Sequence, residues 1–386
     1  MNSLKVKDYN QAEQECMAML PVRVIQAFQP ITFREIGYPV HIRRESELFK
    51  YVDVMHEQRF ENDFQNLFGG GLRVEEFELL KRVTEWICRF SESRFGKKAI
   101  ARGSVLRALN VMRHIKYVHG DKRPTVFEIG PGCGYLGAML ILEGYPYAGT
   151  DISQAFYLYQ NHFWNFITDG KVTELAEHGN NTEALAEVSP KSALHIPWWK
   201  FFDANFLKKL PSFDIITCNH VLCEMHPESL GYNLRIAHDV LKSNGTFLFE
   251  GWGLEKVNLN IESVTSRFHQ FGFSLIHNDQ LITAFTPSNG DNAHGALVLP
   301  RKVTQNNIVL QNEQPVLVKS QRDSFNPGEY TSTHNPVSRS ILSGRTEEAR
   351  PVGIEEVNQF YTDLLGSEDH RSPDEVFWEL IGHPKG

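Results

Sequence analysis

The segment Glu128-Ile-Gly130-Pro-Gly132-Cys-Gly134 constrains the fold of this chain more than any other. It follows the run Thr125 to Ile129, which is typical of a short buried strand, and it precedes the apolar run Tyr135 to Leu142, which is typical of a helix. Glycines between a strand and a helix let a ligand lie directly against the backbone. Ligands of open α/β sheets bind at the carboxyl ends of the strands, so we expect a cofactor at this turn.

Strands and helices alternate after residue 124, which indicates a doubly wound, mostly parallel sheet. The predicted helices of this region are Tyr135 to Leu142, Ile152 to Ile167, Pro227 to Leu241 and Ile261 to Phe271. The predicted strands are Thr125 to Ile129, Tyr145 to Thr150, Ala193 to Ile196, Phe213 to Cys218, Gly245 to Glu250, Phe273 to His277 and Ala296 to Pro300.

The glycine pattern argues against a dinucleotide. The third glycine of a pyrophosphate-binding G-x-G-x-x-G would fall at position 135, which is Tyr135. An acidic residue, Glu128, instead precedes G-x-G-x-G, and a carboxylate suits a cationic cofactor without phosphates. A nicotinamide-dependent oxidoreductase is therefore disfavoured.

Two further carboxylates follow predicted strands. Asp151 comes about 20 residues after the glycine turn, where a carboxylate can accept hydrogen bonds from both ribose hydroxyls. Asp203 could accept from an adenine amino group while Phe202 covers the ring. The alternatives are that Asp151 only caps a helix and that Asp203 is an ordinary loop residue.

The order and spacing of these motifs resemble class I S-adenosylmethionine-dependent methyltransferases. The resemblance rests on the glycine turn, Asp151, Asp203-Ala204 and the segment Phe213 to His220, and it covers roughly residues 104–301. It implies an α/β Rossmann-like fold with a mostly parallel seven-stranded sheet, of which Ala296 to Pro300 would be the antiparallel seventh strand. It also implies S-adenosyl-L-methionine as cofactor. The residues assigned to it are Glu128, Gly130, Gly132, Gly134, Asp151, Phe202, Asp203 and Asn219.

Two stretches also resemble the sugar O-methyltransferase family. They are Asp151 to Gln160 and the later segment Asn219 to Met225. That family often carries a serine ahead of its Glu-Met pair, and the aligned residue here is Val221. This departure counts against a sugar as the acceptor more than it counts against methyl transfer.

His220 and Glu224 are the candidate catalytic residues. A hydroxyl acceptor needs a general base, and histidine is the commonest one. His220 follows a predicted strand, and Glu224, four residues on, could orient it or bind a substrate hydroxyl. A structural His220 is the alternative, and His226 is expected to be a loop residue. We predict no metal site, because His-x-x-x-Glu-x-His lacks the spacing of known zinc motifs.

We expect three parts: a helical N-terminal cap at 1–103, a methyltransferase domain at 104–301 and a C-terminal extension at 302–386. The cap is indicated by amphipathic stretches at Ser46 to Phe68 and Val74 to Phe90, while Ser104 to Val118 is a further one. The extension is rich in Asn, Gln, Ser, Thr and Pro. We expect it to pack on the domain or on a second copy of the chain, as a homodimer, or to be partly disordered.

The formal net charge of −8 disfavours nucleic acid as acceptor, and the chain has no polybasic membrane anchor. Five cysteines without a CxxC pair fit the reducing cytoplasm. The sequence thus predicts O-methylation of a small molecule. Alternatives are N-methylation, a different S-adenosylmethionine reaction such as cyclisation or aminocarboxypropyl transfer, and a non-catalytic binding module, which the intact cofactor motif disfavours.

Overall fold

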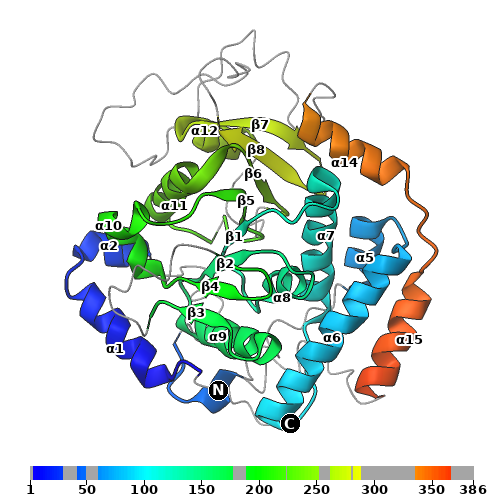
Figure 1. Ribbon diagram of the computed structural model, residues 1–386, viewed down its shortest axis with the longest axis horizontal. Coiled ribbons are helices and arrows are strands. Elements are labelled where there is room, and N and C mark those ends of the chain that lie inside the picture. Colours follow the sequence, from blue (N-terminus) through cyan, green and yellow to red (C-terminus); the bar gives the residue numbers. More distant parts are fainter. Residues whose placement is uncertain are drawn as a thin grey trace, which may run out of the picture.

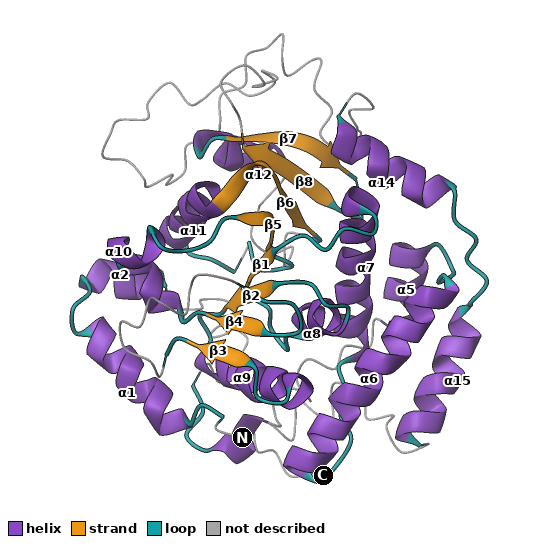
Figure 2. Ribbon diagram, viewed as in Figure 1, coloured by secondary structure: helices purple, strands orange, loops and turns teal. Residues whose placement is uncertain are grey.

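The computed structural model describes residues 3–28, 41–48, 60–176, 188–222, 224–251, 261–279, 281–287 and 335–366. Within these residues the chain forms one eight-stranded sheet with helices on both faces (Figures 1 and 2). The strands are β1 Val126–Ile129, β2 Tyr147–Thr150, β3 Val172–Glu174, β4 Ala193–His195, β5 Phe213–Thr217, β6 Leu241–Phe249, β7 Phe273–Asn278 and β8 Thr283–Pro287. The α-helices are α1 Val6–Met17, α2 Val22–Ala27, α5 Phe60–Phe68, α6 Val74–Phe95, α7 Arg102–His119, α8 Tyr135–Leu142, α9 Gln154–Thr168, α10 Ala204–Leu207, α11 Pro227–Val240, α12 Ile261–Gln270, α14 Pro336–Thr346 and α15 Ile354–Leu365, and the 3₁₀ helices are η1 Glu45–Glu47 and η3 Trp198–Phe202.

The strands lie in the order β3-β4-β2-β1-β5-β6-β8-β7. All neighbouring pairs from β3 to β6 are parallel, and β8 is antiparallel to both β6 and β7. Strands β2 to β4 lie on one side of β1, and strands β5 to β8 lie on the other side. The reversal between β1 and β5 is the topological switch point at which such sheets bind ligands.

The α/β fold agrees with the sequence prediction, but the sheet differs at both edges. β3 is an additional strand, between the predicted helix Ile152 to Ile167 and the predicted strand Ala193 to Ile196. The eight described strands are therefore six of the seven predicted strands together with β3 and β8. The predicted antiparallel strand Ala296 to Pro300 lies outside the described residues. β8 occupies the antiparallel position between β6 and β7, and the sequence analysis did not predict it.

Alternating side chains of the central strands form a separate core on each face of the sheet. Val126 and Ile215 belong to the core under α7, α8 and α9, whereas Phe127 and Ile216 belong to the core under α10, α11 and α12. This period of two is what a strand buried on both faces requires. Both cores hold the carboxyl ends of β1 and β5 in place.

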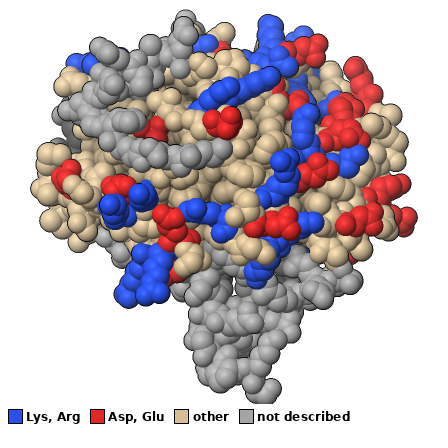
Figure 3. All heavy atoms as spheres, turned by 60° about the horizontal axis from the view of Figure 1, so that its bottom comes forward, with Lys and Arg blue, Asp and Glu red and all other residues tan. Residues whose placement is uncertain are grey.

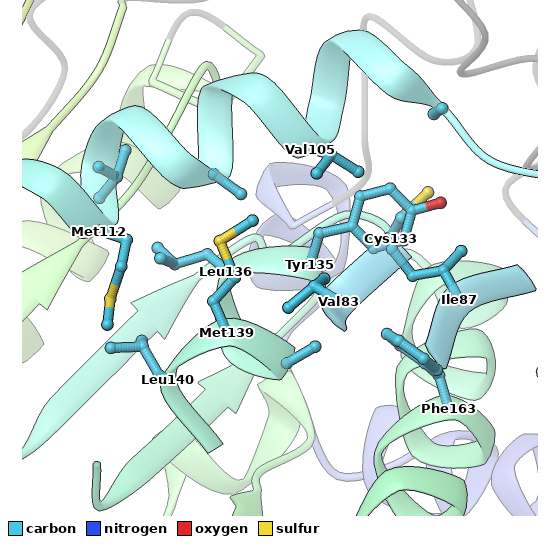
Figure 4. Packing of buried hydrophobic residues seen from close by; sticks show 14 of the residues in the cluster. Val83, Ile87, Val105, Met112, Cys133, Tyr135, Leu136, Met139, Leu140 and Phe163 are labelled. Carbon is cyan, nitrogen blue, oxygen red and sulfur yellow. The ribbon is translucent and has the colours of Figure 1, made fainter. Parts of the chain in front are cut away.

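The longer helices of the N-terminal third stack behind the helix that follows the glycine turn. Figure 4 shows Val83 and Ile87 of α6 and Val105 and Met112 of α7 close to the side chains of α8. The cluster also includes Cys133, Tyr135, Leu136, Met139, Leu140 and Phe163. The N-terminal helices are thus continuous with the core that supports the turn.

The remaining helices pack on this framework from several sides. α1 contacts η3 and α2 contacts α11, while α14 contacts α7 and β7, and α15 contacts α6 (Figure 1). Helix α6 ends at Phe95, because the next residue, Gly96, has a left-handed φ of 79° that cannot continue the helix. None of the described helices combines the length and apolar character needed to cross a membrane.

Candidate active site

The glycine turn links β1 to α8 at the switch point. Gly130, Gly132 and Gly134 have φ values of 71°, 57° and 70°, which other residues rarely adopt. A Cβ atom on Gly130 would lie 2.7 Å from Cγ2 of Val221, so this position has no room for a side chain. A Cβ on Gly132 would meet nothing within 4 Å, and its backbone therefore borders open space.

Glu128 and Asn219, which the sequence assigned to the cofactor, lie together at the ends of β1 and β5. The Glu128 carboxylate accepts a hydrogen bond from the Tyr147 hydroxyl at 2.7 Å and a long one from Asn219 Nδ2 at 3.5 Å. Burial raises the pKa of Glu128 to about 7, and these two donors only partly oppose that rise. The negative charge of Asp151 also contributes to this raised pKa.

Asp151 lies just after β2 and reaches back to the glycine turn. Its Oδ2 accepts from the Gly132 amide at 3.3 Å and from Gln160 Nε2 at 2.8 Å, and its Oδ1 accepts from the Ser153 amide at 2.9 Å. Burial nevertheless raises the pKa of Asp151 to about 6. Because Ser153 is the N-cap position of α9, Asp151 also helps to begin this helix.

Phe202 and Asp203 form a second group at the end of η3. Phe202 stacks on Tyr232 with ring centroids 4.7 Å apart and 12° between the ring planes, and Phe28 of the N-terminal region packs edge-on against it. Oδ1 of Asp203 accepts from the Asn205 amide at 2.8 Å and so caps α10. Among the described contacts, none joins Asp203 to Asp151 or Glu128, so its adenine role stays a prediction.

His220 and Glu250 form a pair between the carboxyl ends of β5 and β6. His220 Nε2 lies 3.0 Å from Oε1 of Glu250, and the His220 amide donates to the Glu250 carbonyl at 3.1 Å. The imidazole side chain is 33% exposed, whereas the Glu250 side chain is 6% exposed. His220 has a φ of 55°, a strained value for a residue with a side chain, and such strain concentrates at functional positions.

Glu250 is a site residue that sequence reasoning missed. Its Oε2 accepts from Asn110 Nδ2 of α7 at 2.8 Å, and its amide donates to Asn219 Oδ1 at 2.9 Å. A usable signal was present, because Glu250 follows strand β6 just as Asp151 follows β2. Glycine at the next position, 251, makes room for the His220 ring, since a Cβ there would lie 2.4 Å from its Cε1.

Glu224 and His226 occupy the turn between β5 and α11. Glu224 is partly buried, and burial together with Asp151 raises its pKa to about 8. Among the described residues it is Glu250 that pairs with His220, which leaves substrate binding as the predicted role of Glu224. His226 Nδ1 accepts from the Glu228 amide at 3.2 Å and caps α11. No group of three metal-ligating side chains that could hold an ion is found in the described part of the chain.

A family comparison identifies the enzyme class. The model of a family described as "Methyltransferase domain" matches residues 97–289, half of the chain, and this range contains the glycine turn, Asp151 and His220. The chain belongs to this methyltransferase family. It is an α/β enzyme that transfers methyl groups from S-adenosylmethionine, in agreement with the resemblance found in the sequence.

Solved methyltransferase structures are similar at low identity. The CcbJ methyltransferase from Streptomyces caelestis has 10% identity and a TM-score of 0.33, and the match covers 47% of this chain and 89% of that one. Magnesium protoporphyrin IX methyltransferase from Synechocystis PCC 6803 has 13% identity and a TM-score of 0.30, with 54% and 97% covered. Ribosomal protein L11 methylase from Lactobacillus delbrueckii subsp. bulgaricus has 15% identity and a TM-score of 0.32, with 48% and 79% covered. No curated protein matches the chain.

The carboxylates at the switch point fit the methyltransferase cofactor. Burial raises the pKa of Glu128, Asp151 and Glu224, and the charge of Asp151 adds to the rise in the other two, so Asp151 repels both Glu128 and Glu224. No Lys or Arg forms an ion pair with them among the described residues. S-adenosylmethionine carries a sulfonium and an ammonium group, and a ligand with these charges relieves the repulsion.

Proposed function

We propose that this methyltransferase O-methylates a hydroxyl group of a small molecule, with His220 as general base and Glu250 as its orienting partner. The observation that carries the proposal is the 3.0 Å contact between His220 Nε2 and the buried Glu250 carboxylate. The carboxylate accepts a hydrogen bond from the Nε2–H group, which leaves the Nδ1 lone pair to take a proton from the hydroxyl of the methyl acceptor. Among the described residues Nδ1 has no hydrogen-bond partner.

The proposed cofactor site comprises the residues around the glycine turn. The turn and Glu128 would hold the amino acid end, Asp151 the ribose hydroxyls, and Phe202 with Asp203 the adenine. When bound, the cofactor supplies a methyl group on a positively charged sulfur that is already a leaving group. The chain then has to orient the acceptor, exclude water and hold the hydroxyl proton at His220 Nδ1.

Surface charge supports a small acceptor over nucleic acid. On the face seen in Figure 3, Lys and Arg side chains lie among Asp and Glu side chains. Arg82 pairs with Glu143, and Lys81 pairs with Glu78 at 2.6 Å. A nucleic-acid interface normally needs a continuous positive surface. The likeness to sugar O-methyltransferases makes glycosides the first acceptor class to test. The cysteine pattern makes the cytoplasm the proposed compartment.

The test is an acceptor screen followed by matched variants. Purified protein is incubated with S-adenosylmethionine and glycosides, phenols, amines or RNA, and products are identified by mass spectrometry. We expect S-adenosylhomocysteine and an O-methylated product with a hydroxyl acceptor. Methylthioadenosine, or transfer only to amines or RNA, would contradict the proposal.

His220→Ala should then lower kcat by about 10²–10⁴-fold, the usual contribution of a general base, with cofactor affinity kept. Glu250→Gln keeps the shape and removes the charge, and should lower kcat by a smaller factor. His226→Ala is the matched control, because it removes a neighbouring histidine that only caps a helix. If His220→Ala turned over acceptor like the wild type, His220 would not be the base.

A further inference from the structure

The side chain of Gln160 connects the glycine turn to Asp151 by hydrogen bonds. It lies on α9 with its side chain fully buried, and its Nε2 donates to the Gly132 carbonyl at 2.8 Å and to Asp151 Oδ2 at 2.8 Å. Both partners are acceptors, so only the NH₂ group of the amide can face them. The orientation of Gln160 is therefore fixed, with Oε1 on the opposite side.

His195 of β4 receives the other end of this amide. Its Nε2 lies 3.2 Å from Gln160 Oε1, and its Nδ1 lies 2.9 Å from Oε2 of Glu174. Both oxygens can only accept, so the ring donates to them from both of its nitrogens. The ring is fully buried and stacks on Tyr157 at 3.6 Å between centroids, with 11° between the planes. A turn of the ring would break both hydrogen bonds.

Glu174 closes the series from strand β3. β3 pairs in parallel with β4 so that Glu174 lies opposite His195. The Glu174 carboxylate also accepts from the Tyr157 hydroxyl, from Asn161 Nδ2 at 2.8 Å and from the Ala176 amide at 2.8 Å. These donors fix the orientation of the Glu174 carboxylate. The additional strand β3 thus supplies the residue that anchors the hydrogen-bonded series Glu174–His195–Gln160.

We propose that Gln160 is a positioning residue for the cofactor, held in orientation by His195 and Glu174. The inference rests on the proposed assignment of Asp151 to the ribose. Recognition of a vicinal diol needs a carboxylate whose free lone pairs point in one direction, and Gln160 fixes both Oδ2 of Asp151 and the carbonyl of Gly132. Without its NH₂ group, both acceptors could turn, and the diol and the amino acid end would each lose a prepared partner.

Four variants test the proposal by S-adenosylmethionine titration calorimetry and urea unfolding of the full chain. Gln160→Met keeps the length without the donor, and Gln160→Glu keeps the shape but puts an acceptor beside Asp151. Thr168→Val is the control, because it removes another buried hydrogen bond on α9, to Trp164. Asp151→Ala reports on the cofactor site itself.

We expect Gln160→Met to raise the Kd for S-adenosylmethionine by about tenfold to a hundredfold, as for loss of a hydrogen bond to a charged group. The new carboxyl of Gln160→Glu would face Asp151 and His195, with Glu174 and Tyr157 behind the imidazole. Two carboxyls that face each other favour sharing a proton, so we expect the new carboxyl to take up a proton as the pH falls from 8 to 6 and thereby to restore a donor to Asp151. Its Kd relative to the wild type should therefore improve, whereas that of Gln160→Met should not.

A role confined to packing predicts something else. If Gln160 only packs the core, the Kd changes of its variants should follow their loss of stability, as in Thr168→Val. The Kd of Gln160→Glu should then show no recovery at low pH. That result would overturn the proposal. Wild-type affinity in both Gln160 variants alongside loss of binding in Asp151→Ala would also overturn it while sparing the cofactor site. Wild-type affinity in Asp151→Ala would overturn the cofactor site and this inference together.

Discussion

Replacing Glu128 by Gln should stabilise the cofactor-free protein at alkaline pH and at the same time weaken cofactor binding. Burial raises the pKa of Glu128 from 4.5 to about 7 in the folded chain. A shift of that size corresponds to about 3 kcal/mol of folding free energy once the group is ionised. Glutamine is neutral at every pH and does not incur this cost.

The sign of the pH dependence follows from the direction of the shift. In the unfolded chain Glu128 loses its proton near pH 4.5, whereas the folded chain keeps it until about pH 7. Wild-type stability therefore falls as the pH rises between these values and does not fall further, on account of this group, above them. The mutant also weakens the contacts with Tyr147 and Asn219, at a cost of about 1 kcal/mol. We expect a net gain of about 2 kcal/mol at pH 8 and a net loss of about 1 kcal/mol at pH 4.5, where only the lost contacts count.

The assay is urea unfolding followed by tryptophan fluorescence at pH 5 and pH 8. Glu143→Gln is the control with the opposite sign. Burial would raise the pKa of Glu143, but Lys116 and Arg82 outweigh it and lower the pKa, so this variant should lose stability at pH 8. In calorimetry, Glu128→Gln should bind S-adenosylmethionine about tenfold more weakly or worse. An unfolding free-energy difference between Glu128→Gln and wild type that is equal at both pH values would refute the reasoning.

Two further predictions concern the same site. Cofactor binding at pH 7 should release protons, because a cationic ligand favours the ionised forms of Asp151 and Glu128, whose pKa values are raised to about 6 and 7. Calorimetry in two buffers of different ionisation enthalpy counts the released protons, and Asp151→Asn should release fewer of them than the wild type. Equal binding heats in the two buffers would contradict this prediction. Gly130→Ala should destabilise the fold more than Gly132→Ala in thermal unfolding, because both residues have positive φ but only the first would drive a Cβ into Val221, at 2.7 Å; equal losses would count against this packing argument.

Local patterns in the sequence were sufficient to predict the central part of the fold. The predicted limits of the helix Tyr135 to Leu142 agree with α8, and the helix Val74 to Phe90 was found as α6, which extends to Phe95. The first is a continuous apolar run preceded by Gly134, and the second has a periodic apolar pattern that ends before Gly96. The helices α1, α2 and α14 were not predicted, because their amphipathic patterns are short and their stability depends on distant contacts. Residues 49–59 of the predicted helix Ser46 to Phe68 lie outside the described residues.

The sequence by itself determined which side chains lie at the carboxyl ends of the strands near the switch point. Glu128 near the end of β1, and Asp151 and His220 after β2 and β5, were found because such a position depends only on where a strand ends. The tertiary structure alone decided which of them meet. Glu250 reaches His220 from 30 positions along the chain, because β6 lies beside β5 in the sheet. Such pairs depend on strand order and register, which are set by the packing of whole strands and helices, and no local pattern encodes them.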